Sequence, residues 1–114
     1  MRDKLFLLSP GFEDPAYPGQ RFYSWHCALL EGVIASFPAL ADRIDIERVA
    51  WPRPRQAVIS LVGEQNQSLP LLVLADDAPS ELATGRHGSV RFVADKDAIL
   101  DVLSRRHGIP VPHP

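Results

Sequence analysis

The stretch KLFLLS, residues 4–9, has four apolar residues in a row, with a lysine before them and Ser-Pro-Gly after them. A strand with one wet face alternates apolar and polar side chains, whereas a strand covered on both faces reads as a continuous apolar run. We therefore expect residues 4–9 to form a strand near the centre of a sheet that is flanked by helices.

The rest of the chain divides between the two periodicities that mark helices and strands. Apolar residues at spacings of three and four predict helices, and short apolar or alternating runs predict strands. Ser24 and Asp95 are the natural N-caps of the first and last helices. In chain order, the expected elements are the strand 4–9, a helix from Ser24 to Pro38, the strand 43–51, a short helix from Pro54 to Gly63, strands at 71–74 and 90–93, and a helix from Asp95 to Gly108.

The order of these elements predicts the fold class. Helices between the first three strands make those strands parallel or nearest neighbours in a mixed sheet. The last two strands, joined by residues 75–89, can pair as an antiparallel hairpin with an elaborated loop. A chain of 114 residues has the length of one domain. We expect a single α/β domain over residues 1–114, with a mixed four-stranded sheet in the order β-α-β-α-β-β-α.

Composition and charge exclude several functional classes. Apolar residues make up 46% of the chain and charged residues 23%, as in ordinary globular proteins. The net charge of −2 gives no basic patch for nucleic acid or anionic lipid. The amino-terminal apolar run is too short for a signal peptide or a membrane span, so we expect a cytoplasmic protein without membrane association. Cys27 is the single cysteine, and the histidines are widely spaced, so we expect no disulfide and no metal site.

The element order, together with three short motifs, resembles the thioredoxin fold, in particular glutaredoxins and the amino-terminal domain of glutathione transferases. SWHC, residues 24–27, lies where that family has its CxxC motif, and SLPLLVL, residues 68–74, resembles the segment that carries its cis-proline. FVADKDAILDVLSRRHG, residues 92–108, is similar to the ESxAIxxYL helix of the transferases. The whole chain is also similar to a small proteobacterial family of thioredoxin-like proteins of unknown function, through PGFEDPAYPGQRFY and HCALLEG.

The resemblance implies a ligand groove between the start of the first long helix and the bend at Pro70. There a cis Pro70 would turn the backbone of Leu69 toward an extended thiol peptide. Ser24 stands at the first cysteine position of the CxxC motif, so dithiol–disulfide exchange is not expected. Cys27 stands at the second position and is either a reactive thiol, activated by His26 and the helix start, or an inert core residue.

Ser24 is also open to two interpretations. Some glutathione transferases use a serine near this helix start to donate a hydrogen bond to the glutathione thiolate, and the adjacent Tyr23 has a hydroxyl for the same task. The alternative is that Ser24 only caps its own helix. Trp25 and His26 complete the expected groove beside this helix start. By the same resemblance, Arg53 is a candidate for binding a ligand carboxylate and Asp95 for binding the other end of the ligand.

Three functional hypotheses remain from the sequence. The first is a protein that binds a small thiol, peptide or protein segment at Ser24–Cys27 without disulfide turnover. The second is an enzyme, either glutathione transferase-like or a monothiol redox protein, that uses Cys27 or Ser24. The third is an interaction module whose groove is closed. No cofactor is required, although glutathione is a possible ligand. The oligomeric state and the role of the long loop 9–22 are left open.

Overall fold

The computed structural model describes residues 2–114, within which five strands form one mixed sheet in the order β2-β1-β3-β5-β4. β1 and β2 are parallel, and the other neighbouring pairs are antiparallel. The strands are β1 (Lys4–Leu8), β2 (Asp45–Val49), β3 (Leu71–Val73), β4 (Gly85–His87) and β5 (Val90–Ala94). The α-helices of the same residues are α1 (Trp25–Ser36), α2 (Gln56–Val62) and α3 (Lys96–His107), and short 3-10 turns cover Pro38–Asp42 and Ser80–Leu82.

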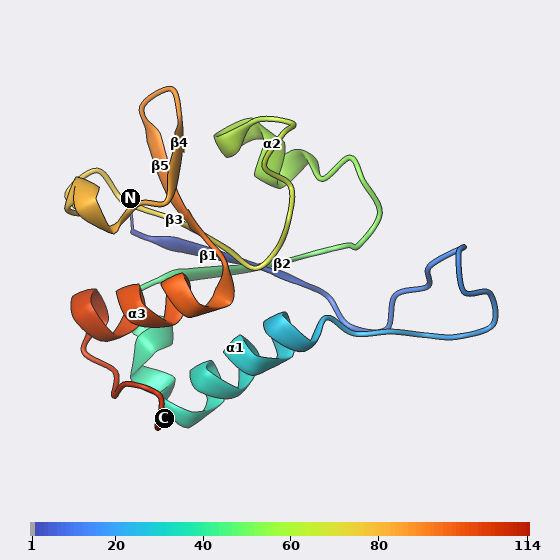
Figure 1. The fold of residues 1–114 in the computed structure, drawn as a ribbon, viewed down its shortest axis with the longest axis horizontal. Coiled ribbons are helices and arrows are strands. Elements are labelled where there is room, and N and C mark those ends of the chain that lie inside the picture. Colours follow the sequence, from blue (N-terminus) through green and yellow to red (C-terminus); the bar gives the residue numbers. More distant parts are fainter. Residues whose placement is uncertain (1) are drawn as a thin grey trace.

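β1 lies inside the sheet and is covered on both faces, as its apolar run predicts (Figure 1). Leu5 and Leu7 are fully buried on the face that α1 and α3 cover, in a cluster that includes Leu30. Phe6 points to the opposite face and belongs to a second cluster with Val58 of α2. The prediction of a central strand buried on both sides is confirmed.

The sheet has five strands, so the predicted count of four is wrong. The extra strand, β4, pairs with β5 at the sheet edge, with Gly85 opposite Phe92. A β-carbon on Gly85 would lie 2.6 Å from the Phe92 ring, so the glycine makes room for that ring. The sequence of β4, Gly-Arg-His, has no alternation of apolar and polar residues and no β-branched side chain. The sequence pattern therefore does not predict this strand.

The antiparallel pairing of the strands on either side of residues 75–89 is confirmed. Leu71 pairs with Ala94, and Val73 with Phe92. The elaborated loop between them contains the 3-10 turn at 80–82 and β4 itself.

Most predicted helix ends are confirmed. Ser24 and Asp95 accept backbone hydrogen bonds as the N-caps of α1 and α3, and Gly63 and Gly108 are the C-caps of α2 and α3. The predicted start of α2 at Pro54 is wrong, because α2 begins two residues later. Its N-cap residue, which follows Pro54, has φ −101° and ψ 85°, so the chain is still non-helical there. Within residues 2–114 no helix is both long and apolar enough to cross a membrane.

Candidate functional site

The ends of four strands meet at one edge of the sheet. Leu8, the last residue of β1, pairs with Val49, the last residue of β2. Leu71, the first residue of β3, pairs with Phe6 of β1 and with Ala94, the last residue of β5. The helices α1, α2 and α3 therefore all begin near this edge, which we call the helix-start edge (Figure 1).

The starts of α1 and α3 contact each other at the helix-start edge. The Lys96 ammonium lies 5.6 Å from the centre of the Trp25 ring, and the rings of Trp25 and His26 are 4.0 Å apart. Because Leu71 pairs with Ala94, the residues just beyond this pair, Pro70 and Asp95, lie side by side at the same edge. The strand register and the Lys96–Trp25 contact thus place Pro70, Asp95 and Trp25 near the same edge, and the groove that the resemblance implies between them stays a prediction.

The Leu69–Pro70 peptide bond is cis, as is Arg53–Pro54. Pro70 itself is buried, and Leu69 is half-buried and packs against both core clusters.

Cys27 and Ser24 occupy different environments. Cys27 is only 2% exposed, and its Sγ accepts a hydrogen bond from the backbone N–H of Leu8 at 3.4 Å. Ser24 Oγ accepts from the backbone N–H of Cys27 at 3.3 Å, which is the N-cap interaction of α1. The serine cap is confirmed. A hydroxyl that accepts in this way still has its own proton to donate.

A cavity of about 350 Å³ lies beside the start of α1. Its wall is mainly apolar and includes residues Ser24 and Cys27, of which Cys27 is only 2% exposed. Leu69 and Pro70 are not among the lining residues, so the cavity lies on the β1 side of the α1 start. The lining residues are Leu8, Pro10, Tyr23, Ser24, Cys27, Ala28 and Glu31.

Two aromatic side chains at the α1 start project into solvent. Tyr23 is 65% exposed and Trp25 is 67% exposed. Because they lie two residues apart at one helix start, they offer aromatic surface on which a ligand or partner can pack.

The two arginines that precede α2 have opposite roles. Arg53 is exposed, and its Nη2 donates to Ser68 Oγ at 3.4 Å, next to the Leu69–Pro70 bend. Arg55 is 6% exposed, and its guanidinium donates to the backbone carbonyls of Trp51, at 2.9 Å from Nε, and Gln67, at 2.7 Å from Nη1. Burial lowers the pKa of Arg55, and the charge of Arg53 adds to this effect.

Arg55 is the residue at this edge that the sequence does not single out. Its hydrogen bonds link the segment that follows β2 to the segment that precedes β3, so it fixes the positions of these two segments relative to each other at the helix-start edge. The signal available in the sequence is the WPRPR stretch, and nothing in it distinguishes the buried arginine from the exposed one.

Asp95 has a positive φ of 82° and caps α3 through a hydrogen bond from the Ala98 N–H to Oδ2 at 3.3 Å. Asp95 is exposed, and the ammonium of the next residue, Lys96, pairs with Asp97 at 3.2 Å. The strand register places Asp95 next to Pro70, and its role at the end of a ligand groove stays a prediction.

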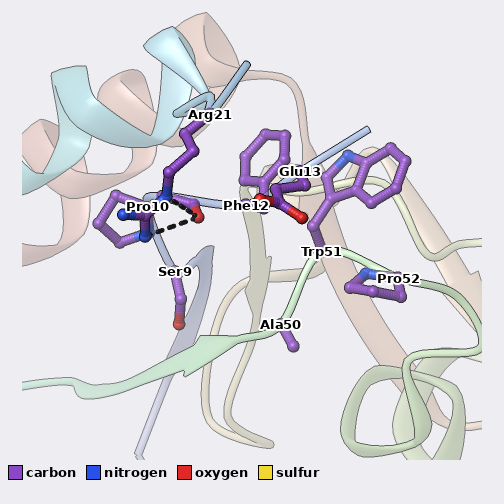
Figure 2. Close-up of a pocket in the computed structure, with 9 residues that line it drawn as sticks. Ser9, Pro10, Phe12, Glu13, Arg21, Ala50, Trp51 and Pro52 are labelled. Atoms are coloured by element: carbon purple, nitrogen blue, oxygen red, sulfur yellow. Dashed lines mark hydrogen bonds between the residues drawn. The ribbon is translucent and has the colours of Figure 1, made fainter. Parts of the chain in front are cut away.

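The loop between β1 and α1 is ordered and encloses a second, larger hollow. Phe12 and Phe22 form an isolated antiparallel bridge, and the ring of Phe12 stacks on Trp51 with centres 5.4 Å apart. Figure 2 shows Arg21 and Trp51 on opposite sides of Phe12. We call this hollow, of about 630 Å³, the loop crevice. The structure described for residues 2–114 contains no group of three or more His, Cys, Asp or Glu side chains arranged to hold a metal ion.

Comparison with known protein families matches residues 2–111 to one described as "Protein of unknown function (DUF3088)". Searches of curated proteins and of solved structures gave no significant match.

Proposed function

The chain belongs to the DUF3088 family, whose description assigns no activity, and from its own geometry we propose that it is a thioredoxin-like ligand-binding protein. It binds a small thiol such as glutathione, or an extended peptide or protein segment, at the start of α1. It does so without dithiol–disulfide turnover. The proposal includes a cytoplasmic location, which suits a chain with one free cysteine.

The thioredoxin-like assignment is supported by the order and direction of the elements. The order strand, helix, strand, helix, strand, strand, helix is kept once the short edge strand β4 is set aside. β1 and β2 are parallel, β3 runs antiparallel to them, and β5, which is antiparallel to β3, runs in the direction of β1 again in the same sheet. Pro70 directly precedes β3, at the edge where α1 begins.

The observation that carries the binding proposal is the exposed aromatic pair at a helix start. Tyr23 and Trp25 flank the cap residue Ser24, and the Lys96 ammonium lies over the Trp25 ring. The amino terminus of a helix carries about half a positive charge and unpaired N–H groups, and the nearby ammonium adds to this field. An anionic ligand with a flexible, partly apolar body, such as a thiol peptide, fits both the charge and the aromatic surface.

Two features argue against disulfide turnover at this site. Ser24 occupies the position at which a dithiol enzyme needs its attacking sulfur, and a hydroxyl cannot form a mixed disulfide. Cys27 has its sulfur buried against β1, so a substrate disulfide would need local opening of α1 to reach it.

A second candidate function is an enzyme, and one observation favours it. Cys27 and Ser24 line the same cavity of about 350 Å³ beside the α1 start. A small ligand in that cavity would lie beside both residues. The Ser24 hydroxyl could donate its proton to a thiolate, as in a transferase, and the Cys27 thiol could react after local opening, as in a monothiol redox enzyme.

A titration of the protein with reduced glutathione, followed by ¹H–¹⁵N correlation spectra, tests the proposal. We expect saturable shifts of the Trp25, His26 and Cys27 amides. Tyr23→Ala should weaken the affinity by roughly 3- to 10-fold, because the ligand loses an aromatic surface. Tyr17→Ala is the matched control, since Tyr17 is 59% exposed but lies on the loop 9–22.

Two results would change the conclusion. Unmoved α1 amides with both glutathione and a short cysteine-containing peptide would reject the binding proposal. Conjugation of glutathione to an aromatic electrophile, abolished in Ser24→Ala or Cys27→Ala, would establish the enzyme in its place.

A further inference from the structure

The loop crevice lies at a topological switch point of the sheet. β1 and β2 are parallel neighbours, yet β1 leads to α1 on one face and β2 leads to α2 on the other (Figure 1). When the connections of adjacent parallel strands leave in opposite directions, a crevice opens outside their carboxyl ends, and ligands of α/β proteins bind in such crevices. Residues 9–13, directly after β1, and residues 50–52, directly after β2, line the loop crevice.

The crevice wall has an aromatic surface that is already in place. Phe12 belongs to the connection after β1 and Trp51 to the connection after β2. Their stacked rings are nearly parallel, with an interplanar angle of 5°. Both side chains are only partly buried. The stack therefore leaves apolar ring surface open to the crevice, where a flat or aromatic group can pack.

Arg21 supplies a positive charge whose orientation is set by the loop itself. Its Nε and Nη2 both donate to the Gly11 carbonyl, at 3.2 and 3.1 Å. Gly11 has φ +83°, which favours glycine, and a β-carbon there would lie 2.7 Å from Arg21 Nη2, so another residue would displace the guanidinium from this position. The Gly11 carbonyl is neutral and leaves the guanidinium charge uncompensated, which suits a carboxylate.

Glu13 brings the opposite charge to the same crevice. It is exposed, and it lines the crevice together with Phe12 and Arg21. A ligand that satisfies both charges carries a carboxylate and an ammonium group. A ligand that also uses the ring surface carries an aromatic side chain.

We propose that the loop crevice binds a small aromatic amino acid as its zwitterion, with the carboxylate on Arg21, the ammonium group on Glu13 and the ring against Phe12 and Trp51. The conformation of the loop is fixed by its own hydrogen bonds. The Phe12–Phe22 bridge joins the two ends of the loop, and the Asp14 carboxylate accepts a hydrogen bond from the Ala16 N–H at 3.0 Å. The crevice adjoins the α1 start, since a smaller hollow between them is lined by both Arg21 and Tyr23, but the ligand proposed for the crevice does not depend on the function proposed for the α1 start.

The test is a titration of the Trp25→Phe variant with L-phenylalanine, followed by fluorescence. The chain has two tryptophans, so Trp51 is the remaining indole in this variant and reports directly on the crevice. We expect saturation with a Kd near 1 mM, in keeping with a ligand of about a dozen heavy atoms in an open site. Adding Arg21→Gln should weaken binding by about tenfold, because the carboxylate loses its charged partner.

The matched control is Arg86→Gln. Arg86 is also an exposed arginine that donates to a glycine carbonyl, that of Gly88 at 3.1 Å, but it lies in β4, at the edge of the sheet. This variant should bind L-phenylalanine as tightly as the parent. Circular dichroism of each variant separates a loss of binding from a loss of folding.

Two analogues distinguish the sources of the ligand. Phenethylamine lacks the carboxylate, and N-acetylphenylalanine, which resembles the C-terminal residue of a peptide, lacks the ammonium group. We expect both to bind several-fold more weakly than L-phenylalanine, and Glu13→Gln to reduce the difference for N-acetylphenylalanine. A flat titration up to the solubility limit, or an unchanged affinity in Arg21→Gln, would overturn the proposal. Equal affinity for N-acetylphenylalanine would also overturn it and would assign the crevice to peptide C-termini.

Discussion

Ser24 and Cys27 differ in their exposure to solvent although they lie within one turn of α1. They are three residues apart, so both lie on the same side of α1, but Ser24 caps the end of the helix whereas Cys27 is buried between the helix and the sheet. The sulfur accepts from Leu8 N–H of the central strand, an interaction available only to a residue that faces the sheet. The apolar stripe that begins at Cys27 indicates this burial, whereas the motif alone indicates a reactive thiol.

The first prediction at the residue scale concerns the reactivity of Cys27. Alkylation by iodoacetamide should be at least about 100-fold slower in the folded protein than in denaturant, because the thiol reacts only after local opening. The rate is measured by mass spectrometry over a series of urea concentrations. Leu29→Cys in a Cys27→Ala background is the control, since Leu29 is 41% exposed on the same helix. Equal rates for the two positions would contradict the prediction and favour the monothiol enzyme.

At the scale of single elements, local chemistry explains most of what the sequence predicts correctly. The caps Ser24 and Asp95 and the stops Gly63 and Gly108 act within one helical turn, so their effects are visible in a short window of sequence. The errors at β4 and Pro54 have a different origin. β4 exists because β5 offers it a partner edge, and the start of α2 is delayed by a connection that the buried Arg55 holds in place.

The prediction for α1 concerns its cap. Ser24→Ala should lower the free energy of unfolding by about 1 kcal/mol, because the Cys27 N–H loses its acceptor, and Ser24→Gly by only a few tenths. Urea denaturation measures both. Ser36→Ala, at the last residue of the same helix, should change the free energy by less than about 0.5 kcal/mol. If Ser24→Ala leaves stability unchanged but removes glutathione binding, the serine is a ligand residue and not mainly a cap.

At the scale of the whole molecule, one buried carboxylate joins the beginning of β1 to the end of α3. Asp3 accepts from the Ala75 N–H at 2.8 Å and from Arg106 Nε at 2.7 Å, and His107 Nε2 lies 2.7 Å from its Oδ2. Burial alone would raise the pKa of Asp3. The hydrogen bonds from Arg106, Ala75 and His107 outweigh burial and hold the pKa below its ordinary value. Arg106 also pairs with Asp77 at 2.9 Å.

This carboxylate makes stability depend on pH in a definite direction. Because the folded-state pKa of Asp3 is depressed, its contribution is complete above the unfolded-state pKa, near 4, and is lost as the pH falls through the lower folded-state value. Asp3→Asn should lower the free energy of unfolding at pH 7 by on the order of 3 kcal/mol. The difference from the parent should shrink as the pH is lowered below about 4.

Urea denaturation at several pH values measures this effect. Asp77→Asn is the control, since Asp77 is 80% exposed and bonds the same arginine, so it should cost less than about 1 kcal/mol. A constant difference between the parent and Asp3→Asn from pH 7 to pH 3 would show that the Asp3 charge contributes nothing.

The arrangement of the whole molecule decides which parts of the candidate site can be predicted from the sequence. The helix starts and Pro70 come together because strand order and direction bring distant segments to one edge, and these follow from the element order. The Asp3–Arg106 pair and the buried Arg55 depend on contacts between side chains far apart in sequence, which no local pattern records. The loop crevice is of this second kind, because Phe12 and Trp51 face each other only after β1 and β2 pair.

The bridge between Phe12 and Phe22 has a consequence for how the protein can vary. It pairs the two ends of the loop with each other, so a change of length at the loop tip would leave β1 and α1 in place, whereas Arg21 is fixed by its hydrogen bonds to the Gly11 carbonyl. Changes at the loop tip would therefore alter the approach to the loop crevice while the sheet and helices stay the same, which makes the tip the place to begin a laboratory selection for new binding preferences.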